Sequence, residues 1–375
     1  MSNHITFPSR PTRRAVLAEG LSSIIAPAFA QTSPNPNPSL ASLAASRLLI
    51  FGTAAATYEL GDADFSRLLA REAAMLVPEY EMNRKIVEPQ AGRHDFSGID
   101  ALMAFANAHD LAFRGHPLVW YNANPPWLEE AVLSSRDERL LTGYVTTLAG
   151  RYRGRMHSLD VVNEALAHPG DGDNNSSGLR QSFWLKAFGT SYIDLAFHAA
   201  HAADPHALLV YNDYGCELGD AAGDGVRANC LRLLDGLLSR GVPVQALGMQ
   251  SHLFAFGVKV DQTKLRNFLA EIAARKLALI ITELDVNDEG GAWDIATRDS
   301  AVAGEAARFL DVVLDCPNLQ AVLTWGLSDR YTDPPQSVPL KMAGWRDRQY
   351  PYDSSLRAKP FRTALARAFS AHKRA

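Results

Sequence analysis

Short runs of apolar, mostly β-branched residues recur along the chain and alternate with longer segments of helical spacing. Eight runs have the length and composition of buried strands: 48–53, 75–79, 112–120, 158–163, 208–212, 244–251, 277–284 and 321–327. The segments between them place apolar residues three and four positions apart, as in Ile99-Leu102-Met103-Ala106 and Leu231-Leu234-Leu237-Leu238. The alternation predicts an α/β fold in which parallel strands are joined by right-handed helical crossovers.

The number of strand–helix units indicates how the sheet is arranged. Eight units favour a single closed (β/α)8 TIM barrel over an open sheet, because closure accounts for the count. No linker rich in proline, glycine or serine interrupts residues 48–368, and no internal repeat is visible. We therefore expect one barrel domain over residues 47–370.

The amino-terminal segment differs in character from the rest. The pair Arg13-Arg14 precedes a mostly apolar stretch, 15–29, that ends in an A-x-A-like cleavage site at residue 30. This pattern predicts an export signal over residues 1–30, with the arginine pair typical of a twin-arginine signal. The proline- and asparagine-rich stretch that follows predicts an unstructured linker over 31–46. The protein is therefore expected to be periplasmic or secreted.

Composition excludes several classes of protein. The charge is nearly balanced, with 37 Lys and Arg against 41 Asp and Glu, and no basic run suggests nucleic acid as a partner. No apolar stretch reaches the length of a membrane span. Nucleotide, zinc and redox motifs are missing, and the three cysteines favour buried free thiols. We expect no cofactor, no metal, no membrane partner and a monomeric protein.

Polar residues gather where the predicted strands end, which is where barrel enzymes carry their chemistry. Six of the runs end in conspicuous polar or aromatic motifs: RGHPLVW (114–120), DVVNEA (160–165), YNDYG (211–215), GMQSHL (248–253), ITELDV (281–286) and TWGLSDRY (324–331). A barrel would bring all six motifs to one rim.

Two carboxylates stand out at this rim. Glu164 and Glu283 close the fourth and seventh runs, and cleavage of a glycosidic bond needs one carboxyl to protonate the leaving oxygen and a second to attack or to activate water. His252 is placed to hydrogen-bond Glu283 and keep it ionised, and Asp285 to fix the histidine. Asn163 can donate to a sugar hydroxyl. Flat faces for sugar rings are offered by Trp120, Trp325, Tyr214 and Tyr331.

Two other interpretations use the same residues. Each glutamate alone is more typical of a salt-bridged rim position, and His252 alone of a structural histidine. A magnesium site at the barrel mouth would use Asp160, Glu164, Glu283 and Asp285 as its ligands. The neighbouring Asn, Gln and Trp residues favour recognition of a sugar over both.

Taken together and in this order, the six motifs resemble glycoside hydrolase family 10, the endo-1,4-β-xylanases, from about residue 52 to residue 369. The resemblance implies a (β/α)8 barrel that hydrolyses xylan, a β-1,4-linked polysaccharide, or its oligosaccharides by retaining double displacement. It implies Glu164 as general acid/base, Glu283 as nucleophile and His252 as the residue that orients it. Substrate-binding positions by the same resemblance are Glu79, Asn83, His116, Trp120, Asn163, Asn212, Tyr214, Gln250 and Trp325.

The chain departs from the family pattern at four positions. Tyr80 and Asn83 stand where the family usually has Asn and Lys, Tyr121 replaces a His, and Asp333 replaces a Trp against the sugar ring. Trp345 is the aromatic that would have to fold back to replace that Trp. These departures leave three alternatives open. The substrate is another β-1,4-glycan, the substrate is a decorated glycan, or the barrel binds carbohydrate without cleaving it.

Overall fold

The computed structural model describes residues 38–168, 177–332, 340 and 342–371. The chain divides into two units, Met1–Asn37 and Pro38–Ala375, and the description below concerns the second. The predicted export signal and Asp333 lie outside the described residues. None of the described helices combines the length and the apolar character needed to cross a bilayer.

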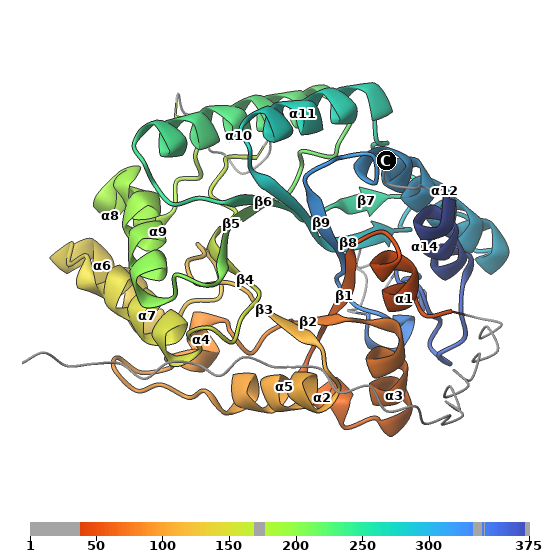
Figure 1. Cartoon of the computed structure of the whole chain (residues 1–375), viewed down its shortest axis with the longest axis horizontal. Helices are drawn as coiled ribbons and strands as arrows, with labels where there is room; N and C mark the ends of the chain where they lie inside the picture. Colours follow the sequence, from red (N-terminus) through yellow and green to blue (C-terminus); the bar gives the residue numbers. More distant parts are fainter. Residues whose placement is uncertain (1–37, 169–176, 333–339, 341, 372–375) are drawn as a thin grey trace, which may run out of the picture. The chain divides into compact units, whose positions relative to one another are not determined.

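Eight parallel strands close into a barrel (Figure 1). The hydrogen-bonded order is β6-β5-β4-β3-β2-β1-β9-β8, and β6 pairs with β8 to complete the ring. A ninth strand, β7, lies outside the ring and pairs in parallel with the second half of β8. The strands are β1 Ile50–Ala55, β2 Met75–Pro78, β3 Ala112–Gly115, β4 Ser158–Asn163, β5 Leu208–Asp213, β6 Ala246–Met249, β7 His252–Phe254, β8 Ala278–Asn287 and β9 Leu319–Thr324.

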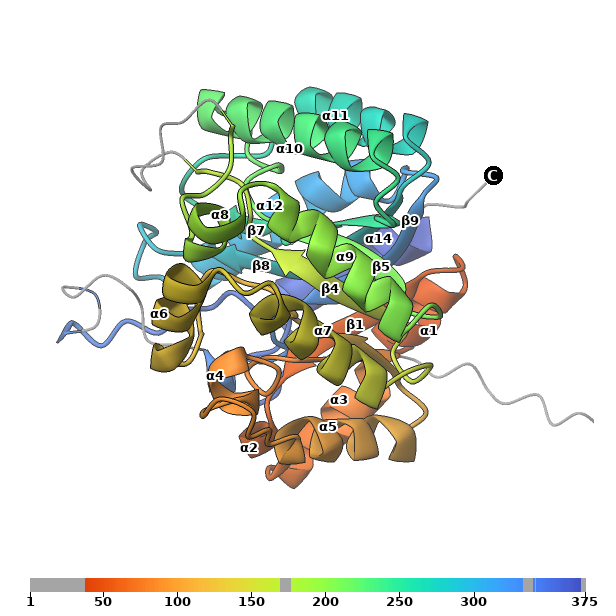
Figure 2. The same ribbon diagram turned by 90° about the vertical axis from the view of Figure 1, so that its left-hand side faces the viewer.

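Helices surround the barrel in chain order, and α10 and α11 lie side by side (Figures 1 and 2). The helices are α1 Leu40–Ala45, α2 Thr57–Leu60, α3 Ala63–Glu72, α4 Arg84–Val87, α5 Ser97–Ala108, α6 Pro126–Ser135, α7 Arg139–Arg151, α8 Phe183–Phe188, α9 Ser191–Ala203, α10 Ala221–Ser239, α11 Gln262–Ala274, α12 Ile295–Val313 and α14 Pro360–Ala371, with a 3₁₀ turn at Asp329–Tyr331. The predicted (β/α)8 TIM barrel is confirmed.

Each of the eight predicted runs overlaps a barrel strand, and the fourth, 158–163, has the observed bounds of β4. The third was expected to reach residue 120, but β3 ends at Gly115. Pro117 follows and has no N–H to donate to a ladder. The backbone N–H groups of Leu118 and Val119 still donate to β4 carbonyls, so the RGHPLVW segment stays against the barrel rim.

Apolar side chains fill the inside of the barrel and the layer between strands and helices. Inside lie Ala54, Met75, Val77, Val210, Ala246, Ile280, Ala321 and Leu323. The outer layer takes up the helical apolar positions, including Ile99, Leu102, Met103 and Ala106 of α5. One predicted core position, Leu238 at the end of α10, is instead 37 % exposed.

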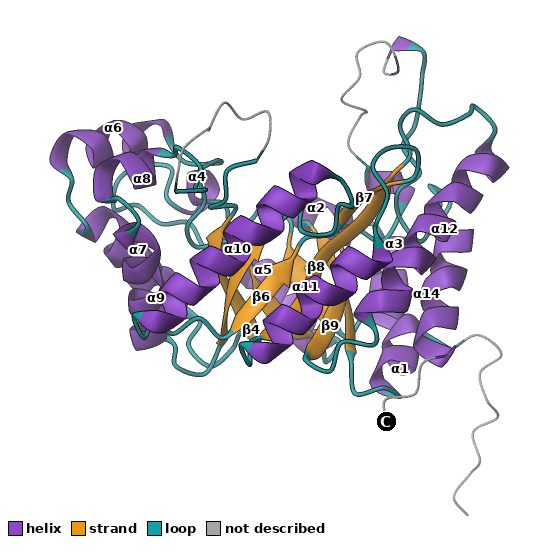
Figure 3. Cartoon of the chain, turned by 90° about the horizontal axis from the view of Figure 1, so that it is seen from above, coloured by secondary structure: helices purple, strands orange, loops and turns teal. Residues whose placement is uncertain are grey.

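The predicted linker over 31–46 extends too far. Its described part contains α1, whose Leu40 and Ala44 are fully buried in the core. Glu72 of α3 accepts a hydrogen bond from the Leu40 backbone N–H at 3.0 Å, and α1 packs on α14. The barrel unit therefore begins before the expected position 47, because this short helix packs on β1, α3 and α14. It lies at the end opposite β7 in Figure 3.

Candidate active site

The strand ends gather the predicted polar side chains at one rim. Asn163 ends β4 and Glu164 follows it, Glu283 and Asp285 lie within β8, and His252 begins β7. Because all eight barrel strands are parallel, these positions come from different strands yet face the same barrel mouth. The helices α4, α6 and α8 lie near this end in Figure 3, away from α1.

Glu164 is turned into the mouth by an unusual backbone conformation. Its φ of 55° lies in the left-handed region, which non-glycine residues rarely adopt. Trp120 Nε1 donates to Glu164 Oε2 at 2.8 Å, and Gln250 Nε2 donates to Oε1 at 3.0 Å. Burial raises the pKa of Glu164, and these two hydrogen bonds oppose the rise without cancelling it. A carboxyl in this state is suited to give up a proton.

Glu283 has the opposite character. Burial alone would raise its pKa, but the hydrogen bond from His252, the positive charges on His116 and His252, and a hydrogen bond from Asn212 together hold the pKa below its ordinary value. Asn212 Nδ2 lies 2.7 Å from Glu283 Oε1, and His252 Nε2 lies 3.3 Å from Oε2. Glu283 is therefore an ionised carboxylate, as the sequence predicted.

His252 is held in turn by Asp285. His252 Nδ1 lies 3.0 Å from Asp285 Oδ2, and the two residues are also register partners in the β7–β8 ladder. Burial would lower the pKa of His252, but the charge and hydrogen bond of Asp285, helped by Glu283, raise it well above its ordinary value. The cation beside Glu283 is thus fixed by both a side-chain ion pair and a backbone ladder.

A chain of amide side chains joins the two glutamates. Asn163 Oδ1 accepts from Gln250 Nε2 at 3.2 Å and from Asn212 Nδ2 at 2.9 Å, while the same two nitrogens reach Glu164 and Glu283 respectively. Asn212 fits because Gly248 lies beside it, where any side chain would collide with the amide oxygen. The predicted Asn163, Asn212 and Gln250 therefore form one connected group.

His116 lies against Glu283 from the other side. Asp160 Oδ2 is 2.8 Å from His116 Nδ1, and Arg114 pairs with the other oxygen of Asp160. Burial would lower the pKa of His116, but the hydrogen bond with Asp160 and the charge of Glu283 raise it. Arg114 and Asp160 are thus supporting residues whose role sequence reasoning did not predict.

The carboxylates considered as magnesium ligands have protein partners instead. Asp160 is taken by Arg114 and His116, and Asp285 by His252. Within the described ranges, no group of three or more His, Cys, Asp or Glu side chains is arranged to hold a metal ion.

A cavity of about 310 Å³ opens beside Glu283. Six predicted residues line it: Glu79, Asn83, His116, Trp120, Asp285 and Trp325. Six further lining residues were not predicted as sugar-binding: Tyr80, Asn287, Glu289, Asp347, Gln349 and Tyr350. Asp347, Gln349 and Tyr350 come from a segment outside every strand and helix, so no periodic pattern marked them.

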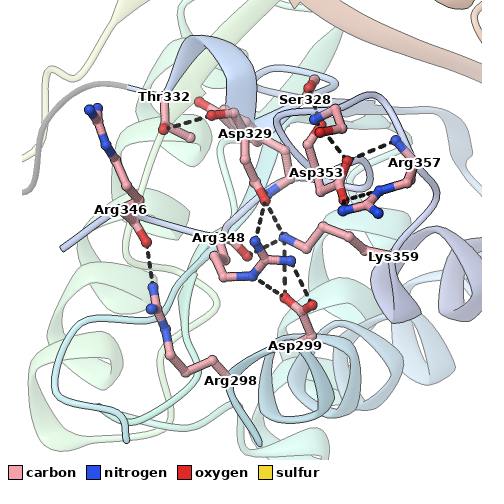
Figure 4. Close-up of polar contacts among 12 residues, drawn as sticks. Arg298, Asp299, Ser328, Asp329, Thr332, Arg346, Arg348, Asp353, Arg357 and Lys359 are labelled. Atoms are coloured by element: carbon pink, nitrogen blue, oxygen red, sulfur yellow. Dashed lines mark hydrogen bonds and ion pairs between the residues drawn. The ribbon is translucent and has the colours of Figure 1, made fainter. Parts of the chain in front are cut away.

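That segment, residues 345–350, is fixed by charged side chains rather than by a sheet. Lys359 Nζ donates to the Arg348 carbonyl oxygen at 2.7 Å and to Asp329 Oδ2 at 2.7 Å. The other oxygen of Asp329 accepts the backbone N–H of Tyr350 at 3.0 Å. Figure 4 shows these groups converging between α12 and α14. This ion network sets the position of one wall of the cavity.

Tyr214 lies outside the cavity, on the Glu164 side. Its ring stacks on His168 with 3.6 Å between ring centroids, and its hydroxyl accepts from Arg180 at 3.0 Å. Arg180 also donates to the backbone carbonyl of Glu164 and places its guanidinium 4.1 Å from the centre of the Tyr121 ring. Tyr121, one of the departures from the family pattern, thus packs on the arginine that supports Glu164.

Tyr331 and Trp345 do not line the cavity either. The Tyr331 ring packs edge-on against Phe65, and its hydroxyl donates to Asp62 at 2.9 Å. Trp345 is only 3 % exposed, because its indole is covered by Arg298, whose guanidinium lies 3.6 Å from the ring centre. Trp345 therefore does not replace the aromatic that the family places at position 333.

A parallel barrel whose mouth holds two carboxyls with opposite pKa shifts, raised for Glu164 and lowered for Glu283, beside tryptophans and amides has the arrangement of a glycoside hydrolase. Comparison with known proteins gives the same class. The profile of "Glycosyl hydrolase family 10" matches residues 39–368, and the chain belongs to this family.

Named relatives and solved structures are similar to most of the chain. Endo-1,4-beta-xylanase B of Paenibacillus barcinonensis is 30 % identical over 296 residues, covering 74 % of this chain and 86 % of the relative. The crystal structure of xylanase 10B from Thermotoga maritima superposes with a TM-score of 0.75 at 29 % identity, covering 88 % and 98 % of the two chains. Xylanase 10B from Thermotoga petrophila, solved with xylobiose, gives a TM-score of 0.75 at 28 % identity over 90 % and 98 %.

Proposed function

We propose that the protein is a retaining endo-1,4-β-xylanase that hydrolyses internal bonds of xylan. The observation that carries this proposal is the opposite pKa displacement of Glu164 and Glu283 within one hydrogen-bonded group. The relatives' activity and the xylobiose held by one of the solved structures support xylan as the substrate. Because the described site is built from a single chain, we also propose that the enzyme acts as a monomer.

In the first step, the Glu283 carboxylate attacks the anomeric carbon and the bond from that carbon to the glycosidic oxygen breaks. The proton of Glu164 passes to the leaving oxygen, so the departing sugar carries no charge. In the second step, water gives its proton to Glu164 and attacks the same carbon, which releases Glu283. The positive charges of His252 and His116 keep Glu283 ready for each cycle.

The remaining residues bind the sugar on either side of the bond. Asn163 accepts hydrogen bonds through its oxygen, so its amide nitrogen is the group available to donate to a sugar hydroxyl. Trp120 and Trp325 border the cavity described above. In the family, the Lys at the position of Asn83 helps to hold the sugar on the non-reducing side of the cleaved bond. Because Asn83 lines this cavity, we assign the cavity to that side, the glycone side.

Asn83 and Tyr80 line this glycone cavity in place of the family's usual Lys and Asn. The exchange removes a cationic donor, and we expect weaker binding of the glycone sugar as a result. A shifted β-1,4-glycan preference is therefore the second candidate, and a cavity that binds sugar without cleaving it is the third.

One experiment separates the three candidates. Release of reducing sugar is measured on xylan, carboxymethyl-cellulose and β-glucan, with Glu283→Gln as the inactive control. We expect activity on xylan that is abolished in the variant. Activity only on a glucan would support the second candidate. No activity on any polysaccharide, with binding retained, would support the third.

We also propose that the protein is exported, on the basis of Arg13-Arg14 and the apolar stretch after them. The test is to express the full chain in a bacterium with a twin-arginine pathway and to separate periplasm from cytoplasm. The variant Arg13→Lys/Arg14→Lys should remain in the cytoplasm in its unprocessed form. Equal export of both forms would overturn the twin-arginine route.

A further inference from the structure

An exposed tryptophan stands beside the glycone cavity. Of the six tryptophans, all within the described residues, Trp293 is the one classed as exposed, with 60 % of its surface accessible. It lies on the loop between β8 and α12, the same loop that contributes Glu289 to the cavity wall, next to Asn287 at the end of β8. Tryptophan offers a large, flat apolar face and is enriched at binding interfaces.

The support beneath Trp293 is rigid. Its ring centre lies 5.1 Å from that of Trp345, and the two ring planes cross at 78°, so Trp345 does not cover it in a parallel stack. Trp345 is buried under the Arg298 guanidinium, and its Nε1 donates to Asp347 Oδ1 at 2.8 Å. Since Asp347 lines the cavity, Trp293 is joined to the cavity wall through a single intervening side chain.

The loop that carries Trp293 is anchored at both ends. Asp288, fully buried at its start, pairs with Arg298 and accepts the backbone N–H of Arg348 at 3.1 Å. Asp294, at its end, caps α12 by accepting the Thr297 N–H at 2.8 Å. A fixed loop holds an aromatic face in place before a ligand arrives, which lowers the entropic cost of binding.

We propose that Trp293 is a distal sugar platform, which stacks on a xylose of the glycan chain beyond the glycone cavity. The proposal rests on the endo-1,4-β-xylanase function above. Its occupant is the continuing polysaccharide, because Trp293 lies on the loop that carries Glu289 of the cavity wall and contacts Trp345, which hydrogen-bonds Asp347 of the same wall. The platform takes an uncharged sugar ring, whose C–H face packs on the indole as other apolar groups do. Polymeric substrate gains binding from it, whereas a substrate that ends inside the cavity does not.

The test compares short and long substrates. Trp293→Ala should leave kcat and KM on an aryl β-xylobioside within about twofold of wild type. On xylohexaose and on soluble xylan it should raise KM about three- to tenfold with little change in kcat. Trp293→Phe should restore most of the loss, because it keeps an aromatic face.

Leu48→Ala is the matched control. Leu48 is 83 % exposed and lies two residues before β1, at the amino-terminal end of the barrel, so its removal should leave kcat and KM on both substrates unchanged. In a second measurement, xylohexaose is added to the inactive Glu283→Gln protein, where it should change the tryptophan fluorescence. The fluorescence change should be smaller in the double variant Glu283→Gln/Trp293→Ala.

Two results would overturn the platform. Equal losses on the short and long substrates would indicate a merely structural residue, and an unchanged KM on xylohexaose would indicate no contact with the chain. Failure of the proposed function is distinguishable, since the wild-type protein would then cleave neither substrate.

Discussion

Replacing His252 by glutamine should move the acid limb of the pH–activity profile upward. Gln places an amide nitrogen near the position of His252 Nε2, so it keeps a donor toward Glu283 and removes the positive charge. The charge on His252 and its hydrogen bond both lower the pKa of Glu283. Asp285 also loses its partner and becomes a nearby negative charge, which acts in the same direction.

The size of the shift follows from the 3.3 Å between His252 Nε2 and Glu283 Oε2. Two unit charges at that distance interact by about 5 kcal/mol at an effective dielectric constant of about 20. The His252 side chain is 34 % exposed, so solvent screening reduces this value. We expect about 1.4–2.7 kcal/mol to remain, which corresponds to a pKa rise of about one to two units for Glu283.

The assay is kcat/KM on an aryl β-xylobioside as a function of pH. Glu283 must be ionised to attack, so activity is lost as pH falls through its pKa, and a raised pKa moves that loss to higher pH. The limb set by Glu164 should stay in place. His94→Gln is the control, because His94 lies 3.8 Å from Glu88, outside the site. A lower kcat/KM with an unmoved acid limb would refute the electrostatic role of His252.

Three further predictions concern other residues. Glu164→Ala should lose far more kcat/KM on xylan than on an aryl xyloside with a very good leaving group, because kcat/KM reports the first step and that substrate needs no protonation there; equal losses of kcat/KM would contradict the acid role. Burial, with Glu79 nearby, raises the pKa of Glu59 from 4.5 to about 8. A raised folded-state pKa favours folding at low pH, and that contribution is lost as pH rises from 4.5 through 8, by about 4–5 kcal/mol. Urea unfolding should therefore show Glu59→Gln gaining stability relative to wild type between pH 4.5 and 8.5, and a constant difference would refute this. Gly326→Ala would drive a methyl group into the Tyr350 ring, so it should lower the free energy of unfolding by about 1–3 kcal/mol and raise KM. Gly304→Ala, in open space on α12, should instead raise the free energy of unfolding by about 0.5–1 kcal/mol. Thermal unfolding of the two variants measures both effects.

Strand positions followed from the sequence wherever apolar runs are long enough to identify. β4 was placed at its observed bounds, because every one of its residues is buried and the run is unbroken. β7 was not predicted as a separate strand, because three residues give no periodic signal and its ladder depends on β8 being extended beyond the barrel. The short helix α1 was hidden by the proline-rich stretch just before it.

The candidate site was predictable to the extent that it lies at strand ends. Asn163, Glu164, Glu283 and His252 follow or fall within apolar runs, so the barrel topology alone brings them together. Asp347 and Tyr350 line the cavity although they lie in a segment that follows no strand directly. Ion pairs hold that segment in place. Such pairings depend on the folded arrangement of α12 and α14, which no local pattern encodes.

The three amide side chains between the two glutamates limit proton transfer within the site. Side-chain amides of Asn163, Asn212 and Gln250 hold their neighbours in place through hydrogen bonds, but they neither gain nor lose protons at accessible pH. The three amides therefore cannot relay a proton, so a proton that Glu164 releases cannot be replaced through them from the side of Glu283. Glu164 has to recover its proton from the water that ends each cycle, which couples recharging of the acid to hydrolysis of the covalent intermediate. An acceptor other than water, such as an alcohol or a second sugar, would recharge it equally well and leave the enzyme ready to transfer sugars rather than hydrolyse them.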